Sequence, residues 1–161
     1  MFGALMFASD ILMEALPNIH LVGMFCVMLT AVFRVRALIP IYVYVALSGV
    51  FSGFDLWWLP YTYIWLPLWA LAMLIPRSAP RWLRCVLYPL ITGLHGLLFG
   101  ALYAPAQALI FGLDFNGMIA WIIAGLPFDL IHALGNLAAG LLVYPLSELT
   151  ATLLKRTRFY A

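Results

Sequence analysis

Apolar residues run along this chain in long stretches that short polar segments separate. The stretches cover residues 1–16, 19–33, 37–53, 61–75, 85–103 and 127–147. A helix that rises 1.5 Å per residue needs about 20 apolar residues to cross a bilayer. The pattern therefore predicts one all-α membrane domain over residues 1–161, a bundle of about six transmembrane helices. The first stretch is short for a bilayer, which indicates a locally thin membrane or a start of the chain further upstream.

Residues 104–126 are apolar but do not fit this scheme easily. Pro105 interrupts the segment, and Pro127 follows it. Proline is common at the first position of a helix, and Asp129 would then lie in a first turn, where its charge suits the helix dipole. We therefore expect a helix that begins at Pro127 and a re-entrant or outer lid over 104–126. Two long tilted helices, kinked at Pro105 and Pro127, are the alternative.

The composition supports a membrane location. Hydrophobic residues make up 66% of the chain and charged residues 9%, and the mean hydropathy is +1.08. Soluble domains carry roughly a quarter charged residues. The chain is therefore predicted to be an integral, multi-pass membrane protein in contact with the lipid bilayer. The net charge of +2 gives no indication of nucleic-acid binding.

The basic residues predict the topology. All of them fall in three short clusters, which are Arg34 and Arg36, then Arg77, Arg81 and Arg84, then Lys155, Arg156 and Arg158. With six spans, the three clusters lie on one side of the membrane. Cytoplasmic loops carry the excess of Lys and Arg, so both termini are expected in the cytoplasm.

The segment 13–20 on the opposite, outer side combines an acid, a proline, an amide and an imidazole. Asp10 and Glu14 lie four residues apart and share a helix face, and Asn18 and His20 follow. A carboxylate that faces lipid is costly, so such groups normally line a cavity or form pairs. We interpret the segment as one wall of a polar pocket. A helix cap and turn, with Glu14 reaching water, is the alternative.

Aromatic side chains gather near the same outer side. Five of the six tryptophans fall in or near the predicted outer loops and the fourth stretch. Trp57, Trp58, Tyr61 and Trp65 are candidates to stack on a flat ligand. An interfacial belt of aromatic residues is the alternative.

A polar stripe crosses the last stretch. Asp129, His132 and Asn136 lie at positions i, i+3 and i+7, which share one helix face. Ionisable groups inside a membrane usually mark a functional site, although a structural hydrogen-bond network between helices fits the same spacing. His95, in the middle of its stretch, is expected to be a core histidine.

No motif of a catalytic or metal site is present. The chain lacks the H-E-x-x-H, P-loop, G-x-S-x-G and G-x-G-x-x-G patterns. The three histidines show no obvious pair opposed at one depth for haem ligation, and a zinc site has no support. We therefore predict a protein that is not an enzyme, with no catalytic residue, no metal and no cofactor.

Several phrases of the chain resemble the S component, the substrate-binding membrane subunit, of energy-coupling factor (ECF) vitamin transporters. The phrases are residues 16–25, 53–61, 103–107 and 117–129, together with the small-x-x-x-small pattern of Ala4 and Ala8. The resemblance covers nearly the whole chain. It implies a subunit of an ABC importer in the bacterial plasma membrane that captures a micronutrient near the outer surface. The subunit would dock through Ala4 and Ala8 on a transmembrane coupling protein that two cytoplasmic ATPases drive.

The charges on the outer side restrict the chemical class of the ligand. No Lys or Arg lies there, whereas Glu14, Asp55, Asp114 and Asp129 do. We therefore expect a neutral or cationic heterocycle. The predicted substrate-binding residues are Glu14, Asn18, His20, Trp57, Trp58, Tyr61, Trp65, Asp129, His132 and Asn136. An intramembrane enzyme that acts on lipid with Asp129 and His132, or a ligand-free accessory membrane subunit, are the alternative functions.

Overall fold

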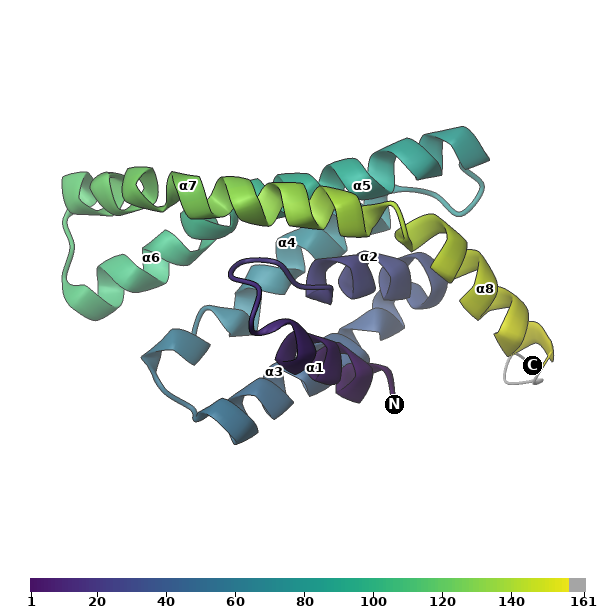
Figure 1. Cartoon of the computed structure of the whole chain (residues 1–161), viewed down its shortest axis with the longest axis horizontal. Coiled ribbons are helices and arrows are strands. Elements are labelled where there is room, and N and C mark those ends of the chain that lie inside the picture. Colours follow the sequence, from purple (N-terminus) through teal and green to yellow (C-terminus); the bar gives the residue numbers. More distant parts are fainter. Residues whose placement is uncertain (157–161) are drawn as a thin grey trace.

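The computed structural model describes residues 1–156, and within them the chain forms helices and no strand. The all-helical fold that the hydrophobic pattern predicts is confirmed. Arg158 lies outside the described residues. The elements (Figure 1) are α1 Phe2–Met13, α2 Val22–Phe33, the 3-10 helix η1 Arg34–Ala37, α3 Leu38–Ser52, the 3-10 helix η2 Leu56–Trp58, α4 Tyr61–Leu74, α5 Arg81–Leu97, α6 Phe99–Phe111, α7 Phe115–Gly140 and α8 Val143–Arg156.

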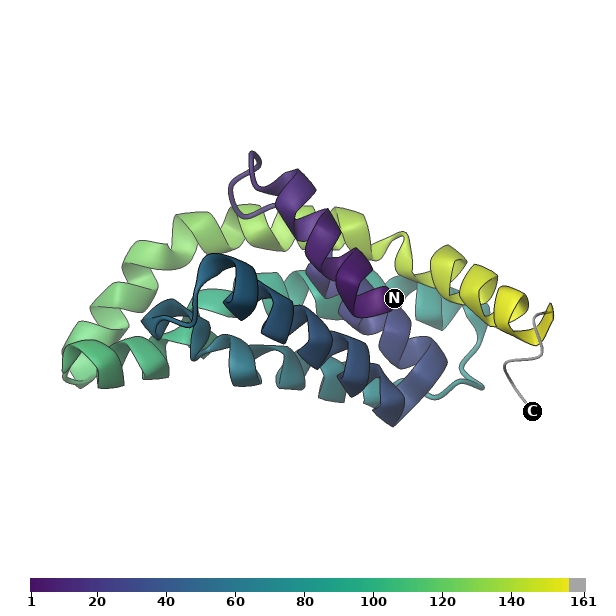
Figure 2. The ribbon, with the colours of Figure 1, turned by 90° about the horizontal axis from the view of Figure 1, so that it is seen from below.

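Three helical stretches in the described chain have the length and apolar composition to cross a membrane. They are Val22–Ser52, Arg81–Phe111 and Phe115–Gly140. The first contains η1, where Arg34 has a φ of 56° and the chain turns back, so that α3 runs opposite to α2 (Figure 2). The structure thus has the features of a membrane protein by length and composition. Six separate spans and a cytoplasmic location of both termini stay predictions.

Residues 104–126 differ from the expected lid. They form most of α6 and the first part of α7, and α7 passes through Pro127 instead of beginning there. The helix begins earlier because the Asp114 carboxylate accepts a hydrogen bond from the Gly117 N–H at 2.7 Å, a typical N-cap. The expectation of a helix start at Pro127 is therefore wrong. The alternative is met in part, since Pro105 lies inside α6, a helix of 13 residues, and Pro127 lies inside the longer α7.

Proline inside α7 bends the helix without ending it. Figure 2 shows α7 curved along its length. An internal proline removes one backbone hydrogen bond and clashes with the preceding turn, which commonly produces a kink. The helix ends at Gly140, and the chain continues as α8 to Arg156, beyond the expected end of the last stretch at residue 147.

Helix α2 lies at the centre of the packing. All residues from Val22 to Thr30 are buried, and α2 contacts α1, α4, α5, α7 and α8. A helix that is apolar on all sides is stable only when neighbours surround it or lipid does. Polar residues from the neighbouring helices gather near the two ends of α2.

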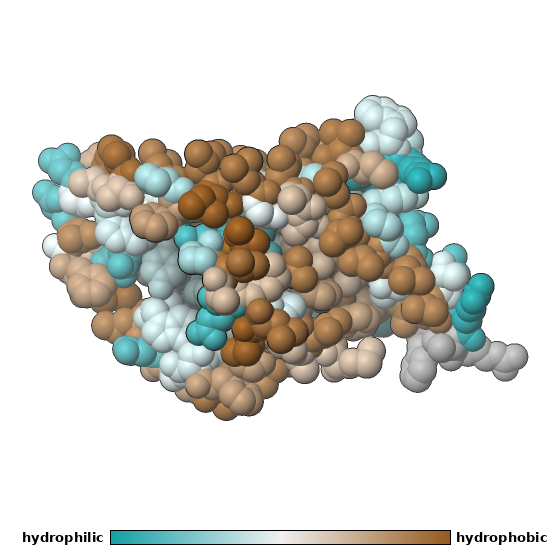
Figure 3. Space-filling view, viewed as in Figure 1, coloured by the Kyte–Doolittle hydropathy of each residue, from teal (hydrophilic) through white to brown (hydrophobic). Residues whose placement is uncertain are grey.

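The outer surface of α5 and α7 is apolar. Figure 3 shows hydrophobic side chains over most of this face and hydrophilic ones over the start of α5. The exposed side chains include Leu90, Leu94, Leu130 and Leu134. Such a continuous apolar surface is typical of contact with lipid.

The backbones of α5 and α7 approach each other closely at small residues (Figure 1). A Cβ atom added at Gly96 would lie 2.8 Å from the His132 carbonyl oxygen and 2.9 Å from the Ala133 Cα. A Cβ at Gly140 would lie 2.6 Å from the Pro89 Cα. Glycine at positions 96 and 140 is therefore required by the packing, since small residues let the backbones of membrane helices approach closely.

The substitution Gly96→Ala tests this contact. We expect it to lower the unfolding temperature in detergent by several degrees, because the added methyl group overpacks a backbone contact at a cost of about 1–3 kcal/mol. Gly125→Ala, in α7 with nothing within 4 Å of the added Cβ, is the matched control and should leave the unfolding temperature unchanged or raise it slightly. Equal effects of the two substitutions would contradict the close approach.

Candidate functional site

Three histidines from different parts of the chain meet inside the bundle. His20 lies two residues before α2 begins, His95 lies on α5 and His132 on α7. The ring centroids of His20 and His132 are 4.6 Å apart, and Trp65 of α4 lies 5.5 Å from His95 and 6.2 Å from His20. Ring centroids this close leave no room for a haem iron between His20 and His132, but the two side chains do meet, which the sequence does not indicate. The histidines meet because the loop before α2 packs against α5 and α7. Helical periodicity in the sequence does not reveal such a contact.

Two further residues complete this group. The Phe99 ring, at the start of α6, lies 4.7 Å from the His132 ring. Asn136 follows His132 by one helical turn and is 1% exposed. Gly23 of α2 leaves room for its amide, since a Cβ there would lie 3.2 Å from Asn136 Oδ1. We call these residues the histidine cluster, which comprises His20, Trp65, His95, Phe99, His132 and Asn136.

The polar atoms of the histidine cluster are mostly unpaired. His95 Nε2 lies 2.9 Å from the Ile64 carbonyl oxygen. Within this cluster, the buried side-chain atoms without a hydrogen-bond partner in residues 1–156 are His20 Nδ1, Trp65 Nε1, His95 Nδ1, His132 Nε2 and both amide atoms of Asn136. A buried polar group without a partner costs about 1–3 kcal/mol, and few such groups occur in folded proteins. Most of the buried unpaired atoms of the described chain lie on residues of the group around Trp65, so this region has hydrogen-bonding capacity that the described residues leave unused.

The histidine at the rim of the cluster is neutral. Burial lowers the pKa of His20 to about 4, so at neutral pH its ring offers one donor and one acceptor instead of a positive charge. His20 therefore contributes hydrogen-bonding groups near Trp65 without contributing a positive charge.

An acidic cavity of about 160 Å³ adjoins the cluster. Its lining residues are Phe7, Asp10, Ile11, Glu14, Ser48, Ser52, Trp57 and Tyr61. The Tyr44 hydroxyl donates a hydrogen bond of 2.9 Å to Asp10 Oδ2. Tyr61 connects the two parts, since its ring centroid lies 5.9 Å from that of Trp65. The face shared by Asp10 and Glu14 thus borders a cavity, as the spacing of the two acids indicates.

Asp129 forms a different contact from the one that its position in the polar stripe with His132 and Asn136 suggests. Its carboxylate accepts the Gly100 N–H at 3.1 and 3.2 Å, next to the break between α5 and α6. The N–H groups in the first turn of a helix lack intrahelical partners, so Asp129 satisfies one of them. The expectation that Asp129 lies in a first helical turn is wrong, because α7 begins at Phe115.

The predicted site residues fall into groups. Glu14, Trp57 and Tyr61 line the acidic cavity, and His20, Trp65, His132 and Asn136 belong to the histidine cluster. Trp58 packs elsewhere: its Nε1 donates to the Val45 carbonyl oxygen at 2.8 Å. Asn18 is exposed and has a φ of 59°, which suits a turn.

Sequence reasoning did not include His95 and Phe99 in the site. His95 has the appearance of a core histidine because its stretch is apolar and gives no polar periodicity. The one signal was local, since glycines at positions 93 and 96 flank His95 and mark the face that meets α7. Phe99 carried no signal, because a phenylalanine in an apolar stretch is unremarkable.

Within residues 1–156, no group of three or more His, Cys, Asp or Glu side chains is arranged to hold a metal ion. No family model, curated protein or solved structure matches this chain. The assignment of a function therefore depends on the geometry of the histidine cluster and the acidic cavity.

The role of Asp129 is testable by a pair of substitutions. We expect Asp129→Leu to destabilise the protein by about 1–3 kcal/mol, because it leaves the buried Gly100 N–H without an acceptor. Asp129→Asn keeps a carbonyl oxygen at that place and should cost much less. Thermal unfolding of both variants in the same detergent measures the difference. If the two variants unfold at the same temperature, the carboxylate does not support the start of α6.

Proposed function

We propose that this protein captures a small, flat, neutral or cationic heterocycle at the histidine cluster and the acidic cavity beside it. The observation that carries the proposal is the set of buried, unpaired polar atoms around Trp65. A planar ring that bears donors and acceptors would satisfy these atoms and stack against the aromatic rings. An apolar guest would leave them unpaired.

The charges near the site support this ligand class. Asp10 and Glu14 line the cavity, whereas Arg34, Arg77, Arg84 and Lys155 line a separate cavity at the other end of α2. An anionic phosphate or dicarboxylate would thus meet only acidic groups and neutral rings. The volume of about 160 Å³ is below the roughly 300–1,000 Å³ that is usual for drug-sized ligands, which favours a compound of one or two rings.

The wider role follows the resemblance to ECF S components. We propose a substrate-capture subunit of an ABC importer for a vitamin or a related micronutrient in the bacterial plasma membrane, without enzymatic activity of its own. Ala4 and Ala8 are exposed on α1, so both are accessible to a transmembrane coupling protein with its two ATPases. Small residues allow close helix contacts of this kind.

The alternative of a structural network has less support. Asp129 bonds to Gly100, and the Asn136 amide has no partner within the described residues. A network that held the helices together would pair these groups. The arrangement therefore favours a binding role for His132 and Asn136.

The substitution Asn136→Leu separates the two roles. Leucine has a similar branched shape and removes the unpaired amide, so we expect unchanged or higher stability, together with a loss of about tenfold in ligand affinity. A thermal unfolding curve and a ligand titration on the same sample give both values. A clear drop in stability with unchanged affinity would assign Asn136 to the structural network instead.

A second prediction concerns the tryptophan at the centre. We expect Trp65→Phe to weaken ligand binding about three- to tenfold, because the smaller ring loses stacking area and the indole N–H. Trp82→Phe, at a residue that is 67% exposed at the start of α5, is the matched control and should bind normally. Equal affinities of the two variants would remove Trp65 from the site.

The ligand itself can be identified by mass spectrometry of small molecules released from protein purified in mild detergent. A stoichiometric heterocycle, or stabilisation by one member of a vitamin and nucleobase panel, would establish the capture role. An empty protein that no compound stabilises would favour the accessory subunit. Metal-dependent turnover of lipid would favour the enzyme.

A further inference from the structure

A polar cavity lies at the opposite end of α2 from the histidine cluster. Its volume is about 370 Å³. It forms where the end of α2, the connection from α4 to α5, the first turns of α5 and the helix α8 meet. The charged residues that line it are Arg34, Arg77, Arg84, Lys155 and Glu148. We call this cavity the basic pocket.

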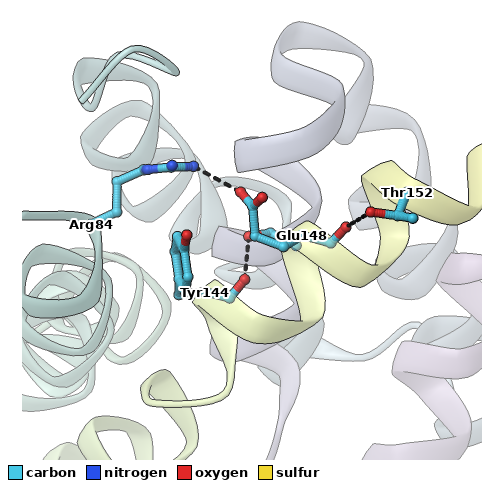
Figure 4. A network of polar contacts seen from close by, with 5 residues as sticks. Arg84, Tyr144, Glu148 and Thr152 are labelled. Carbon is cyan, nitrogen blue, oxygen red and sulfur yellow. Dashed lines mark hydrogen bonds and ion pairs between the residues drawn. The ribbon is translucent and has the colours of Figure 1, made fainter. Parts of the chain in front are cut away.

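Most of the positive charge in the basic pocket is uncompensated. Arg84 of α5 forms an ion pair of 3.0 Å with Glu148 of α8, and its guanidinium lies 5.0 Å from the centre of the Tyr144 ring, as Figure 4 shows. This is the one ion pair within residues 1–156. Arg34, Arg77 and Lys155 thus give the pocket an excess of three positive charges.

Two of these arginines are held in place by backbone carbonyls. Arg34 donates to the Ile75 carbonyl oxygen at 3.0 Å and to that of Met73, and Arg77 donates to the carbonyl oxygen of Val32. Carbonyl acceptors fix the guanidinium groups without neutralising them. The Nε of Arg84 is also buried and has no partner within the described residues. The pocket is therefore organised before an anion arrives, which reduces the entropy cost of binding.

The surroundings indicate a membrane interface. An apolar groove of about 470 Å³ between α5 and α7 begins at Cys85, directly after Arg84, and includes Leu90, Leu134 and Leu137. Trp82 lies exposed at the start of α5, and exposed tryptophans are typical anchors at the level of the headgroups. Neighbouring residues of α5 thus line a charged pocket and an apolar groove, which together match the two chemistries of a phospholipid.

From these contacts we propose that the basic pocket binds the phosphate group of an anionic phospholipid, with an acyl chain along the groove between α5 and α7. Arginine forks suit phosphate oxygens, and basic pockets between membrane helices bind anionic headgroups on the cytoplasmic side. The positive-inside rule predicts that side for this end of the bundle. The proposal depends on membrane insertion and is independent of the micronutrient.

Native mass spectrometry of the full chain in detergent tests the proposal. Phosphatidylglycerol is titrated against the parent protein, against Arg77→Gln/Lys155→Gln and against the control Arg36→Gln/Arg156→Gln. The control removes the same charge from exposed residues that do not line the pocket. We expect the pocket variant to lose roughly tenfold or more in affinity and the control to stay within about twofold. Lys155→Gln alone replaces the double variant if that variant unfolds early.

Two further titrations identify the source of the phosphate. Phosphatidylcholine, which is zwitterionic, should bind at least about tenfold more weakly than phosphatidylglycerol, and inorganic phosphate should not compete at millimolar concentration. Equal losses of affinity in both double variants, or equal binding of the two lipids, would overturn the assignment of the phosphate site to the basic pocket. Competition by inorganic phosphate would indicate that the pocket binds a free phosphate compound and would overturn the proposal of a phospholipid ligand. Binding of neither lipid would overturn the proposal and favour a protein partner for this surface.

Discussion

The close backbone contact between α5 and α7 is the constraint on which the site depends. Gly96 lies against the backbone of His132 and Ala133, and His95 is the neighbour of Gly96 in the chain. The two helices can approach to this distance only without a side chain at position 96, and the approach brings His95 and His132 to the same level of the bundle. A larger residue there would separate the helices and the two rings together.

Within this frame the protein keeps polar groups inside an apolar bundle at a cost to stability. Each buried and unpaired atom around Trp65 destabilises the folded state by an amount comparable to a lost hydrogen bond. Packing of α2 against its neighbours offsets this cost, because nearly every residue of α2 is buried. In the proposed function, stability and binding thus depend on different residues of the same bundle.

The two ends of α2 have opposite electrostatic character. Asp10 and Glu14 line the cavity near its first residue, and three uncompensated basic side chains gather near its last. The same charge asymmetry that predicts the orientation in a membrane also separates the ligand chemistry, since the acidic end suits a neutral or cationic compound and the basic end suits a phosphate group.

The sequence by itself determined the helical class, the apolar surface, the clustering of the basic residues, and the shared face of Asp10 and Glu14, because each follows from composition, from position along the chain or from helical spacing. Only the tertiary structure decided that Asp129 supports α6 and that His20 and His95 join His132. A local pattern reports the face of one helix and the strength of one cap. It does not report which helices meet or at what level, since that depends on the summed packing of all of them.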